Sequence, residues 1–168
     1  MSKRDLSQEE LLELFEYDPL IGDLIWRVTL APVAPVGSIA GTVDGGGYVQ
    51  VRIRGKKYRA NRIVWIMHNG AIPEGYVLDH ENREILDNTI ENLRLATSSQ
   101  NQFNTGSRGG ASKYKGVFRD NSGKKWRAKI TANKVVRYLG TFDTELEASG
   151  AYQSAARVLH GDFYYGGD

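Results

Sequence analysis

Apolar residues recur at helical spacing in two segments of the N-terminal half. Ser7 to Glu10 form a capping box, and the apolar residues from Leu11 to Phe15 then give a short helix one apolar face. Pro19 ends this helix. A second helix is predicted from Asn61 to His68, where apolar residues again recur at helical spacing, and Gly70 ends it.

Strand patterns lie between these two helices. A short run at residues 25–28 and longer runs at 38–43 and 48–54 read as strands, with three glycines supplying the turn between the last two. Along 48–54, apolar residues alternate with polar and basic ones, which predicts one apolar face and one basic face. Residues 31–37, which hold two prolines and a glycine, predict a loop.

The C-terminal part has its own pattern. Residues 103–112 (FNTGSRGGAS) have the composition of a flexible linker. Strand patterns follow at 114–119, 125–131 and 135–142, and a helix of apolar residues at helical spacing begins after Asp143-Thr144 and ends before Gly161. Three strands and one helix make a module small enough to be only marginally stable alone. The whole pattern predicts an α+β protein.

Composition narrows the class of protein. The chain has 168 residues, of which 40% are hydrophobic and 25% charged, as in globular proteins rather than disordered ones. The absence of cysteine excludes disulfides and cysteine-based zinc sites, and three histidines far apart in sequence do not favour a structural zinc. Acidic residues interrupt the N-terminal apolar segment, so no signal peptide is predicted, and no apolar run approaches membrane-spanning length.

Charge is unevenly distributed along the chain, although the net charge is only +2. Acidic residues crowd the N-terminus: Asp5, Glu9, Glu10, Glu13, Glu16, Asp18 and Asp23. Basic residues crowd two later segments, 52–62 and 113–137. The small net charge therefore hides two cationic surfaces, and such surfaces are typical of proteins that bind nucleic acid.

The residues with the most specific chemistry are Asp79, His80, Asn92 and Asn101. A histidine can take a proton from water near neutral pH, and carboxylate and carboxamide oxygens suit a hard cation such as Mg²⁺. Adjacent side chains on a strand point to opposite faces, so Asp79 and His80 would converge only at a strand end or bulge. This set is the inventory of a single-metal site that cleaves phosphodiesters. The alternative, a surface Asp-His pair with asparagines in turns and caps, stays open.

These residues lie in a segment, from about 58 to 101, that resembles an HNH endonuclease of the phage homing type. The resemblance rests on Arg62-Ile63-Val64-Trp65, His68, Gly70, Pro73, Gly75, Asp79-His80, Asp87-Asn88, Asn92-Leu93-Arg94 and Ala96-Thr97. It implies a ββα-metal fold, a two-stranded hairpin with a helix packed across it. It also implies that Asp79 and Asn101 bind Mg²⁺ or Mn²⁺, that His80 is the general base, and that Asn92 orients His80. Asn61 stands where relatives usually have His, and we interpret it as a supporting residue.

Residues from about 112 to 165 resemble an AP2 DNA-binding domain, through Tyr114-Lys115-Gly116-Val117, Trp126 to Ile130, Leu139 to Thr144 and the alanine-rich helix. The resemblance implies a three-stranded sheet in the major groove with a helix bracing its back. Candidate DNA contacts here are Lys115, Arg119, Lys125, Trp126, Arg127, Lys129 and Arg137, and in the first basic segment Arg52, Arg54, Lys57 and Arg59. The alternatives are solvated strands and, for Trp126, a place in the core.

We therefore expect four parts: an N-terminal helix with basic strands (1–57), an HNH core (58–102), a linker (103–112) and an AP2-like domain (113–168). The expected function is metal-dependent nicking of double-stranded DNA by a cytoplasmic enzyme, in the host cytoplasm if it is phage-encoded. We expect a monomer without a membrane partner, although a dimer would allow a double-strand break. The alternatives are a non-catalytic DNA-binding regulator whose HNH site has decayed, and a nuclease that acts on RNA.

Overall fold

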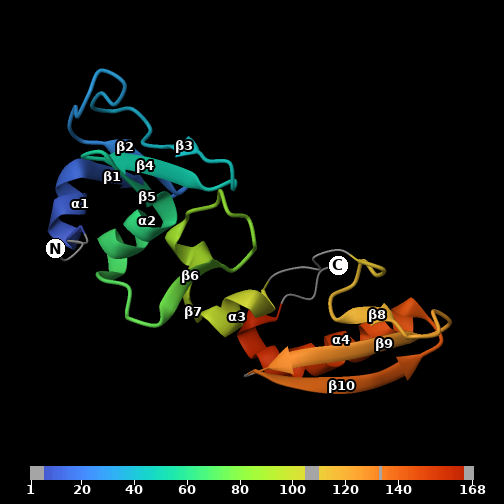
Figure 1. Cartoon of the computed structure of the whole chain (residues 1–168). Helices are drawn as coiled ribbons and strands as arrows, with labels where there is room; N and C mark the ends of the chain where they lie inside the picture. Colours follow the sequence, from blue (N-terminus) through green and yellow to red (C-terminus); the bar gives the residue numbers. More distant parts are fainter. Residues whose placement is uncertain (1–5, 105–109, 133, 165–168) are drawn as a thin grey trace. The chain divides into compact units, whose positions relative to one another are not determined.

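The chain forms two compact units, residues 1–96 and 97–168, which are described separately (Figure 1). The computed structural model describes residues 6–104, 110–132 and 134–164. Helices and small antiparallel sheets alternate along the chain, which confirms the α+β class. Half of the predicted linker, residues 105–109, lies outside the described residues. Within the described ranges, no helix is both long and apolar enough to cross a membrane.

The first unit begins with helix α1 (Gln8–Leu14), whose N-cap Ser7 accepts a hydrogen bond from the backbone of Glu10, as the capping box predicts. The helix ends before Phe15, which was predicted to be helical. Phe15 instead opens strand β1 (Phe15–Asp18) and pairs with Trp26 of β2 (Asp23–Trp26). The two rings lie 4.5 Å apart and are buried, so aromatic packing across the hairpin overrides the helical spacing.

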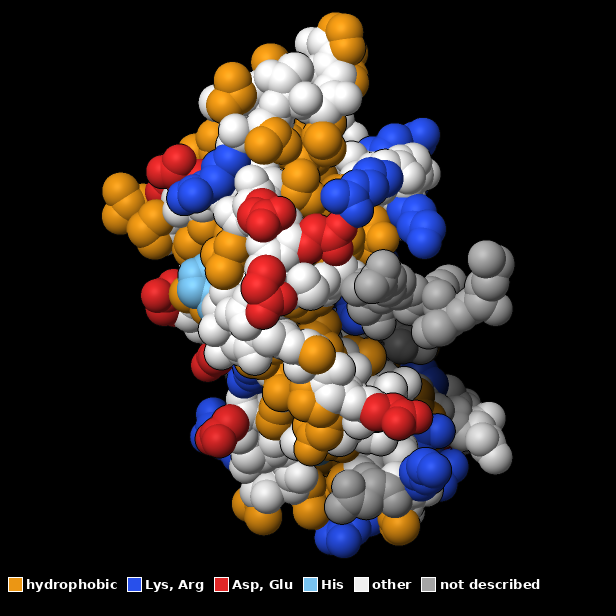
Figure 2. Space-filling view, turned by 90° about the vertical axis from the view of Figure 1, so that its left-hand side faces the viewer, with side chains coloured by type: hydrophobic (Ala, Val, Ile, Leu, Met, Phe, Trp, Pro, Cys, Tyr) orange, Lys and Arg blue, Asp and Glu red, His pale blue; other side chains and the backbone are white. Residues whose placement is uncertain are grey.

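Residues 31–37 are irregular as predicted, but the strands predicted at 25–28 and 38–43 are shorter than expected, because β2 ends at Trp26 and β3 covers only Thr42–Val43. The loop between β2 and β3 exposes apolar side chains. A short bridge between Ala31 and Ala34 closes its tip. Val33 is 92% exposed, and Val36 and Ile39 are also exposed. This loop forms the upper tip in Figure 2, where hydrophobic side chains are uncovered.

A three-stranded sheet follows, in the order β3 (Thr42–Val43), β4 (Val49–Ile53) and β5 (Lys56–Arg59). Its register pairs Val51 with Tyr58 on the face that packs on the core, and Arg52 with Lys57 on the outer face. The alternation along β4 is therefore confirmed. Strand β5 was not predicted, because its sequence KKYR holds one apolar residue and carries no strong strand pattern.

Helix α2 (Ala60–Asn69) covers this sheet and packs Ile63, Val64 and Met67 into the main core of the unit. Gly70 ends it with a positive φ of 76°, as expected for the glycine after the helix. The chain then forms β6 (Tyr76–His80), a loop, the 3₁₀ turn η1 (Ile90–Asn92) and β7 (Leu93–Thr97), which pairs with β6. This pair of strands and its loop carry most of the candidate site.

The second unit starts with helix α3 (Ser98–Phe103), which has a complete capping box between Thr97 and Gln100. Strands β8 (Val117–Arg119), β9 (Trp126–Ala132) and β10 (Val135–Phe142) form an antiparallel sheet in the order β10-β9-β8. Helix α4 (Glu145–His160) packs across one face of this sheet, and the turn η2 (Gly161–Phe163) follows it. Three strands and one helix are thus present in the predicted order.

Substitution of Gly116 tests how tightly α4 packs on this sheet. A Cβ added there would lie 2.3 Å from the Tyr152 ring and 2.5 Å from the Lys129 carbonyl oxygen. Gly116 has φ 72°, and the matched control Gly123 has φ 69° but nothing within 4 Å of its added Cβ. We expect Gly123→Ala to lower the free energy of unfolding by about 1 kcal/mol, and Gly116→Ala by about 3 kcal/mol or more. Denaturant unfolding of the full chain measures both, and equal losses would contradict close packing at Gly116.

Candidate active site

Asp79 and His80 are the last two residues of β6, and both are 5% exposed. Neighbours within a strand normally point to opposite faces, but these two lie where the strand ends and the loop begins. The expectation that they meet at a strand end is therefore confirmed for the backbone. Both side chains are buried, so they do not form the surface Asp-His pair that was the alternative.

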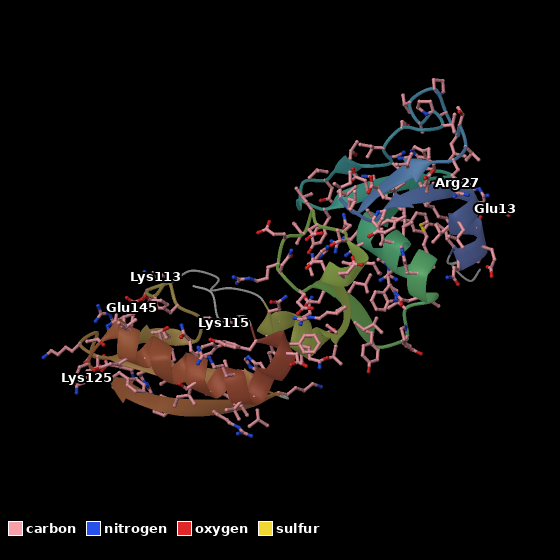
Figure 3. The ribbon with its side chains drawn as sticks, turned by 180° about the vertical axis from the view of Figure 1, so that it is seen from behind. Glu13, Arg27, Lys113, Lys115, Lys125 and Glu145 are labelled. Atoms are coloured by element: carbon pink, nitrogen blue, oxygen red, sulfur yellow. The ribbon has the colours of Figure 1, made fainter. Side chains whose placement is uncertain are left out.

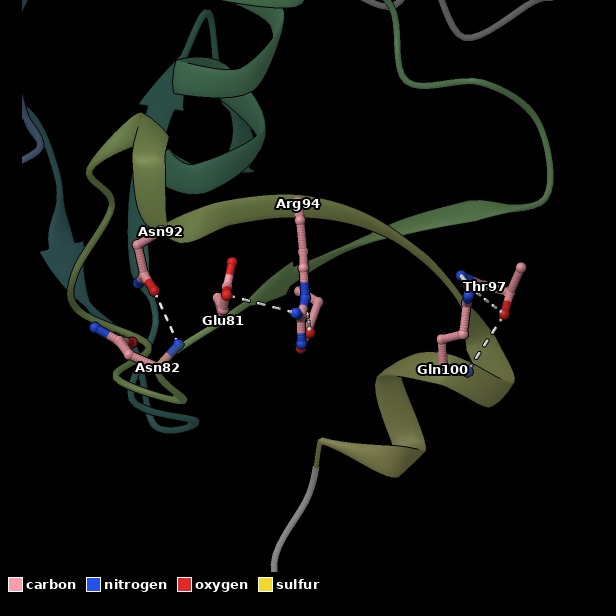
Figure 4. Close-up of polar contacts among 7 residues, drawn as sticks. Glu81, Asn82, Asn92, Arg94, Thr97 and Gln100 are labelled. Atoms are coloured by element: carbon pink, nitrogen blue, oxygen red, sulfur yellow. Dashed lines mark hydrogen bonds and ion pairs between the residues drawn. The ribbon is translucent and has the colours of Figure 1, made fainter. Parts of the chain in front are cut away.

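The buried carboxylate of Asp79 has a charged partner. Arg94, on the neighbouring strand β7, donates from Nε to Asp79 Oδ2 at 2.9 Å. The Nη1 atom of Arg94 also lies 3.8 Å from the carboxylate of Glu81, which is 63% exposed (Figure 4). Burying a carboxylate without a partner is very costly, so the hydrogen bond from Arg94 offsets part of the cost of burying Asp79.

The imidazole of His80 has a neutral partner, Asn88, which is also buried. His80 Nε2 lies 3.2 Å from Asn88 Oδ1, while Asn88 Nδ2 donates to the Leu86 carbonyl at 3.3 Å. Because the amide nitrogen faces a carbonyl, the amide oxygen must face the ring, and an oxygen only accepts. Nε2 therefore donates to Asn88, and a neutral His80 would carry its lone pair on Nδ1. Sequence reasoning assigned no role to Asn88, although it quoted Asp87-Asn88 as part of the motif.

Asn92 closes the loop that joins the two strands. Its side-chain oxygen accepts from the Asn82 backbone at 2.9 Å, and its side-chain nitrogen donates to the Asp87 carbonyl at 2.8 Å (Figure 4). Its backbone carbonyl accepts from the Glu81 backbone at 2.9 Å. On this geometry Asn92 would act on His80 through the loop rather than through the ring, and its orienting role stays a prediction.

Asp87 anchors the same loop from its other side. Its carboxylate accepts from the Thr89 hydroxyl at 2.6 Å, from the Thr89 backbone at 3.1 Å and from Asn82 Nδ2 at 2.7 Å. Hydrogen bonding from the Thr89 side chain is the main reason that the pKa of Asp87 lies below its usual value, although burial opposes this. Asp87 is therefore an anion that stabilises the loop above acidic pH.

Asn101, the predicted second metal ligand, lies on α3 in the second unit, and its role as a ligand stays a prediction. Within the described ranges no three His, Cys, Asp or Glu residues cluster as a metal site. The candidate donors are one carboxylate oxygen and one carboxamide oxygen. This set suits Mg²⁺ or Mn²⁺, which accept few protein ligands and fill the rest of their shell with water and phosphate oxygens, and it does not suit zinc.

One cationic face belongs to the first unit and adjoins the candidate site. We call it the β4–β5 face: Arg52, Lys57 and Arg59 lie together on the outer side of this sheet. The guanidinium of Arg59 lies 3.8 Å from the centroid of the Tyr48 ring, and that ring lies 6.3 Å from the ring of His80. Tyr48 thus connects the β4–β5 face to the imidazole.

Arg54, the fourth predicted contact of this segment, is placed differently. It lies in the turn between β4 and β5 with a positive φ of 48° and forms an ion pair with Glu10 of α1. An acidic helix therefore already compensates its charge, which argues against a contact with DNA phosphate.

The second unit carries another cationic face, on the side of the sheet away from α4. We call it the β9 face. Arg127 and Lys129 alternate along β9 with buried residues, and Phe118 and Tyr138 flank them on the neighbouring strands. Arg127 Nε donates to the Tyr138 hydroxyl at 2.9 Å, and the ammonium of Lys129 lies 5.1 Å from the Phe118 ring centroid. Aromatic side chains thus hold both cations on this face.

The remaining predicted contacts of the second unit lie elsewhere. Trp126 is 7% exposed and packs in the core with Val117 and Ala128. Its ring therefore occupies the core position that was the alternative to a DNA contact. Arg119 covers the Trp126 ring at 3.9 Å. Arg137 pairs with Ile130, which packs against α4, so it lies on the opposite side from the β9 face.

Two lysines of the prediction have protein partners. Lys115 Nζ donates to the carbonyls of Gln102 and Phe103 at 2.7 and 2.9 Å, which satisfies the C-terminal end of α3. Lys125 pairs with Asp143 at 3.0 Å, and this exposed ion pair raises the pKa of Lys125. Figure 3 shows the two lysines apart from each other, with Lys125 at one end of the module.

Comparisons with known proteins agree with this picture. Residues 58–103 match the HNH endonuclease family. An uncharacterized HNH endonuclease of Acanthamoeba polyphaga mimivirus is 33% identical over 108 residues, which is 64% of this chain and 56% of that protein. Protein 3.8 of Escherichia phage T7 is 33% identical over 101 residues, 60% of this chain and 83% of the phage protein. The chain thus spans little more than half of the mimivirus relative.

Among solved structures, one of DNA binding and cleavage by the HNH homing endonuclease I-HmuI is similar at a TM-score of 0.39 and 22% identity. The match covers 52% of this chain and 49% of that chain. A likeness this slight carries no weight for the fold or the chemistry.

Asn92 should be the residue on which the loop depends most. Asn92→Ala removes two side-chain hydrogen bonds, and we expect it to lower the free energy of unfolding by about 1–3 kcal/mol. Hydrogen exchange should show faster exchange of the Asn82 amide, which donates to the Asn92 side chain. The exposed Asn69→Ala is the matched control and should change the unfolding free energy by less than about 0.5 kcal/mol. Unchanged protection of the Asn82 amide would contradict the closing role of Asn92.

Proposed function

Because the chain belongs to the HNH endonuclease family, we propose that it is a metal-dependent endonuclease that hydrolyses phosphodiester bonds in double-stranded DNA. The observation that carries this proposal is the pair of buried groups at the end of β6. Asp79 is held as a carboxylate, and His80 is held with its basic nitrogen on Nδ1. An acid that can bind a cation and a base that can take a proton thus lie side by side.

In this proposal, His80 is the catalytic base and takes a proton from the attacking water at Nδ1. Asn88 fixes the tautomer by accepting from Nε2, and Asn92 and Asp87 hold the loop that carries Asn88. Asp79 and Asn101 would hold the divalent ion, most simply Mg²⁺ with Mn²⁺ as the alternative. When bound, such an ion neutralises charge on the scissile phosphate and on the leaving 3′ oxygen. One site of this kind cuts one strand per encounter, so we propose nicking by a monomer.

The cationic faces would bind the DNA. A three-stranded sheet can enter the major groove, and we propose that the second unit does so with its β9 face, in the manner of an AP2 domain. Arg127 and Lys129 are the residues of this face that we assign to DNA. The β4–β5 face, with Arg52, Lys57 and Arg59, would bind phosphates beside His80. A separate targeting module on a nuclease is the arrangement expected of a homing-type enzyme.

A second candidate function is a DNA-binding regulator with an inactive nuclease site. Asn61 favours it, because the resemblance to HNH enzymes leads us to expect histidine there. The Asn61 side chain is 5% exposed, and its Oδ1 has no hydrogen-bond partner. A residue that fits its surroundings this poorly is what a decayed site would leave behind.

A plasmid assay separates the two functions. The parent protein should convert supercoiled plasmid to the nicked form only when Mg²⁺ or Mn²⁺ is present. We expect His80→Ala to slow nicking by about 10²- to 10⁴-fold, because a general base contributes that much, and to leave DNA binding nearly unchanged. His68→Ala is the matched control, since the imidazole of His68 contacts the Val64 carbonyl and the Tyr17 ring rather than the end of β6.

The outcomes are distinct. Nicking by His80→Ala at the parental rate would make the assignment of the base wrong. Binding without cutting in every metal by the parent itself would favour the regulator.

DNA binding should depend on which side of the second sheet an arginine occupies. We expect Arg127→Ala to weaken binding about tenfold and to reduce the salt dependence by about one phosphate contact. Arg137→Ala removes the same charge from the other side of the sheet and should weaken binding by less than about threefold. Fluorescence anisotropy at several salt concentrations measures both, and equal losses would argue against the β9 face as the contact surface.

A further inference from the structure

Arg94 lies between two carboxylates of very different exposure. It donates to Asp79, which is 5% exposed, and lies 3.8 Å from Glu81, which is 63% exposed. The Arg94 side chain itself is 17% exposed. Both carboxylates belong to the chain segment at the end of β6, and the Glu81 backbone is fixed by the carbonyl of Asn92.

Two positive charges compete for Asp79 if the proposed function is correct. The carboxylate must be ionised to bind a divalent cation, and a buried carboxylate stays ionised only when a positive charge accompanies it. Arg94 supplies that charge in the structure described here. A divalent ion at Asp79 would then repel the guanidinium, because like charges at such short range are strongly unfavourable.

We propose that Arg94 is a built-in counter-ion of Asp79, which it releases to Glu81 when the divalent ion binds. This inference rests on the proposed metal-dependent function. Glu81 is the acceptor because its carboxylate already lies 3.8 Å from the guanidinium, and because its backbone is held in place while its side chain reaches solvent. The guanidinium can therefore change partner by a side-chain rotation with the strands unmoved.

The exchange has a measurable consequence for ion affinity. Arg94 stabilises the ion-free site, so removing it should tighten ion binding. Glu81 stabilises the displaced guanidinium, so removing its charge should weaken ion binding, but only while Arg94 is present. A residue that coordinated the ion directly would instead weaken binding in either background.

The test is a double-mutant cycle measured by ion binding rather than by activity. The free Mn²⁺ signal in electron paramagnetic resonance gives the dissociation constant of the full-length protein without DNA. The variants are Arg94→Met, Glu81→Gln and the two combined, with Asp79→Asn to show that the ion binds at Asp79. Arg62→Met, which removes an exposed arginine of α2, is the matched control. Arg94→Lys keeps the charge and should stay within about threefold of the parent.

We expect Arg94→Met to lower the Mn²⁺ dissociation constant by about tenfold and Glu81→Gln to raise it by about threefold. In the Arg94→Met background, Glu81→Gln should have no effect. Glu81 lies at the surface, so Glu81→Gln tests the proposal even if Arg94→Met folds poorly. Weaker binding by Arg94→Met, or an equal effect of Glu81→Gln in both backgrounds, would overturn the exchange.

Failure of this inference differs from failure of the proposed function. A parent that nicks plasmid with Mn²⁺ but shows no coupling between Arg94 and Glu81 would keep the nuclease and lose the counter-ion. If the parent protein binds no Mn²⁺, or if Asp79→Asn binds Mn²⁺ equally well, the ion does not bind at Asp79. Both the counter-ion exchange and the proposed metal site would then be wrong.

Discussion

Three hydrogen bonds from Asn92 hold the loop between β6 and β7, and the candidate site depends on them. The loop has no regular structure until η1, and Arg83 within it adopts a positive φ of 68°. Such a segment keeps one conformation only when its backbone groups have fixed partners. Asn92 supplies partners to both ends of the loop, and the loop in turn carries Asn88 to the imidazole of His80.

The two buried groups at the end of β6 receive opposite kinds of support. The acid, Asp79, has a cation beside it, whereas the base, His80, has a neutral carboxamide. A carboxamide fixes the orientation and tautomer of an imidazole without adding a charge to the site. A cation keeps a buried carboxylate ionised. Each group thus has a hydrogen-bond partner suited to its proposed role.

Local signals in the sequence were sufficient for most elements of the fold. Capping residues and helical spacing predicted the helices that begin after Ser7 and Thr144, and alternation predicted the long strands of the second sheet. Phe15 was missed because its partner Trp26 lies across a hairpin, and spacing within one helix says nothing about such a partner. Trp126 stayed ambiguous for a related reason, since alternation divides a strand into two faces without saying which one meets a helix.

The candidate site was predictable to the same extent as the fold: its distinctive residues could be named from the sequence, but their partners could not. Asp79 and His80 carry distinctive chemistry, and they lie at a strand end, one of the two positions at which the sequence analysis allowed them to converge. Their partners could not be chosen from spacing. Arg94 reaches Asp79 only because β7 pairs with β6, and Asn88 reaches His80 only because Asn92 closes the loop. Both facts depend on tertiary structure, in which residues many positions apart meet.

The two cationic faces share one arrangement of side chains, which bears on how DNA binding and phosphodiester cleavage would be connected. An aromatic ring supports the central arginine of each, Tyr48 under Arg59 and Tyr138 beside Arg127. A guanidinium held in this way loses less conformational freedom when it binds phosphate or a base edge. In the first unit that supporting ring also faces His80, so a phosphate bound by the β4–β5 face lies close to the base. Under the proposed function, the β9 face would contribute affinity, because tethering a second DNA-binding surface raises the local concentration of substrate at the first.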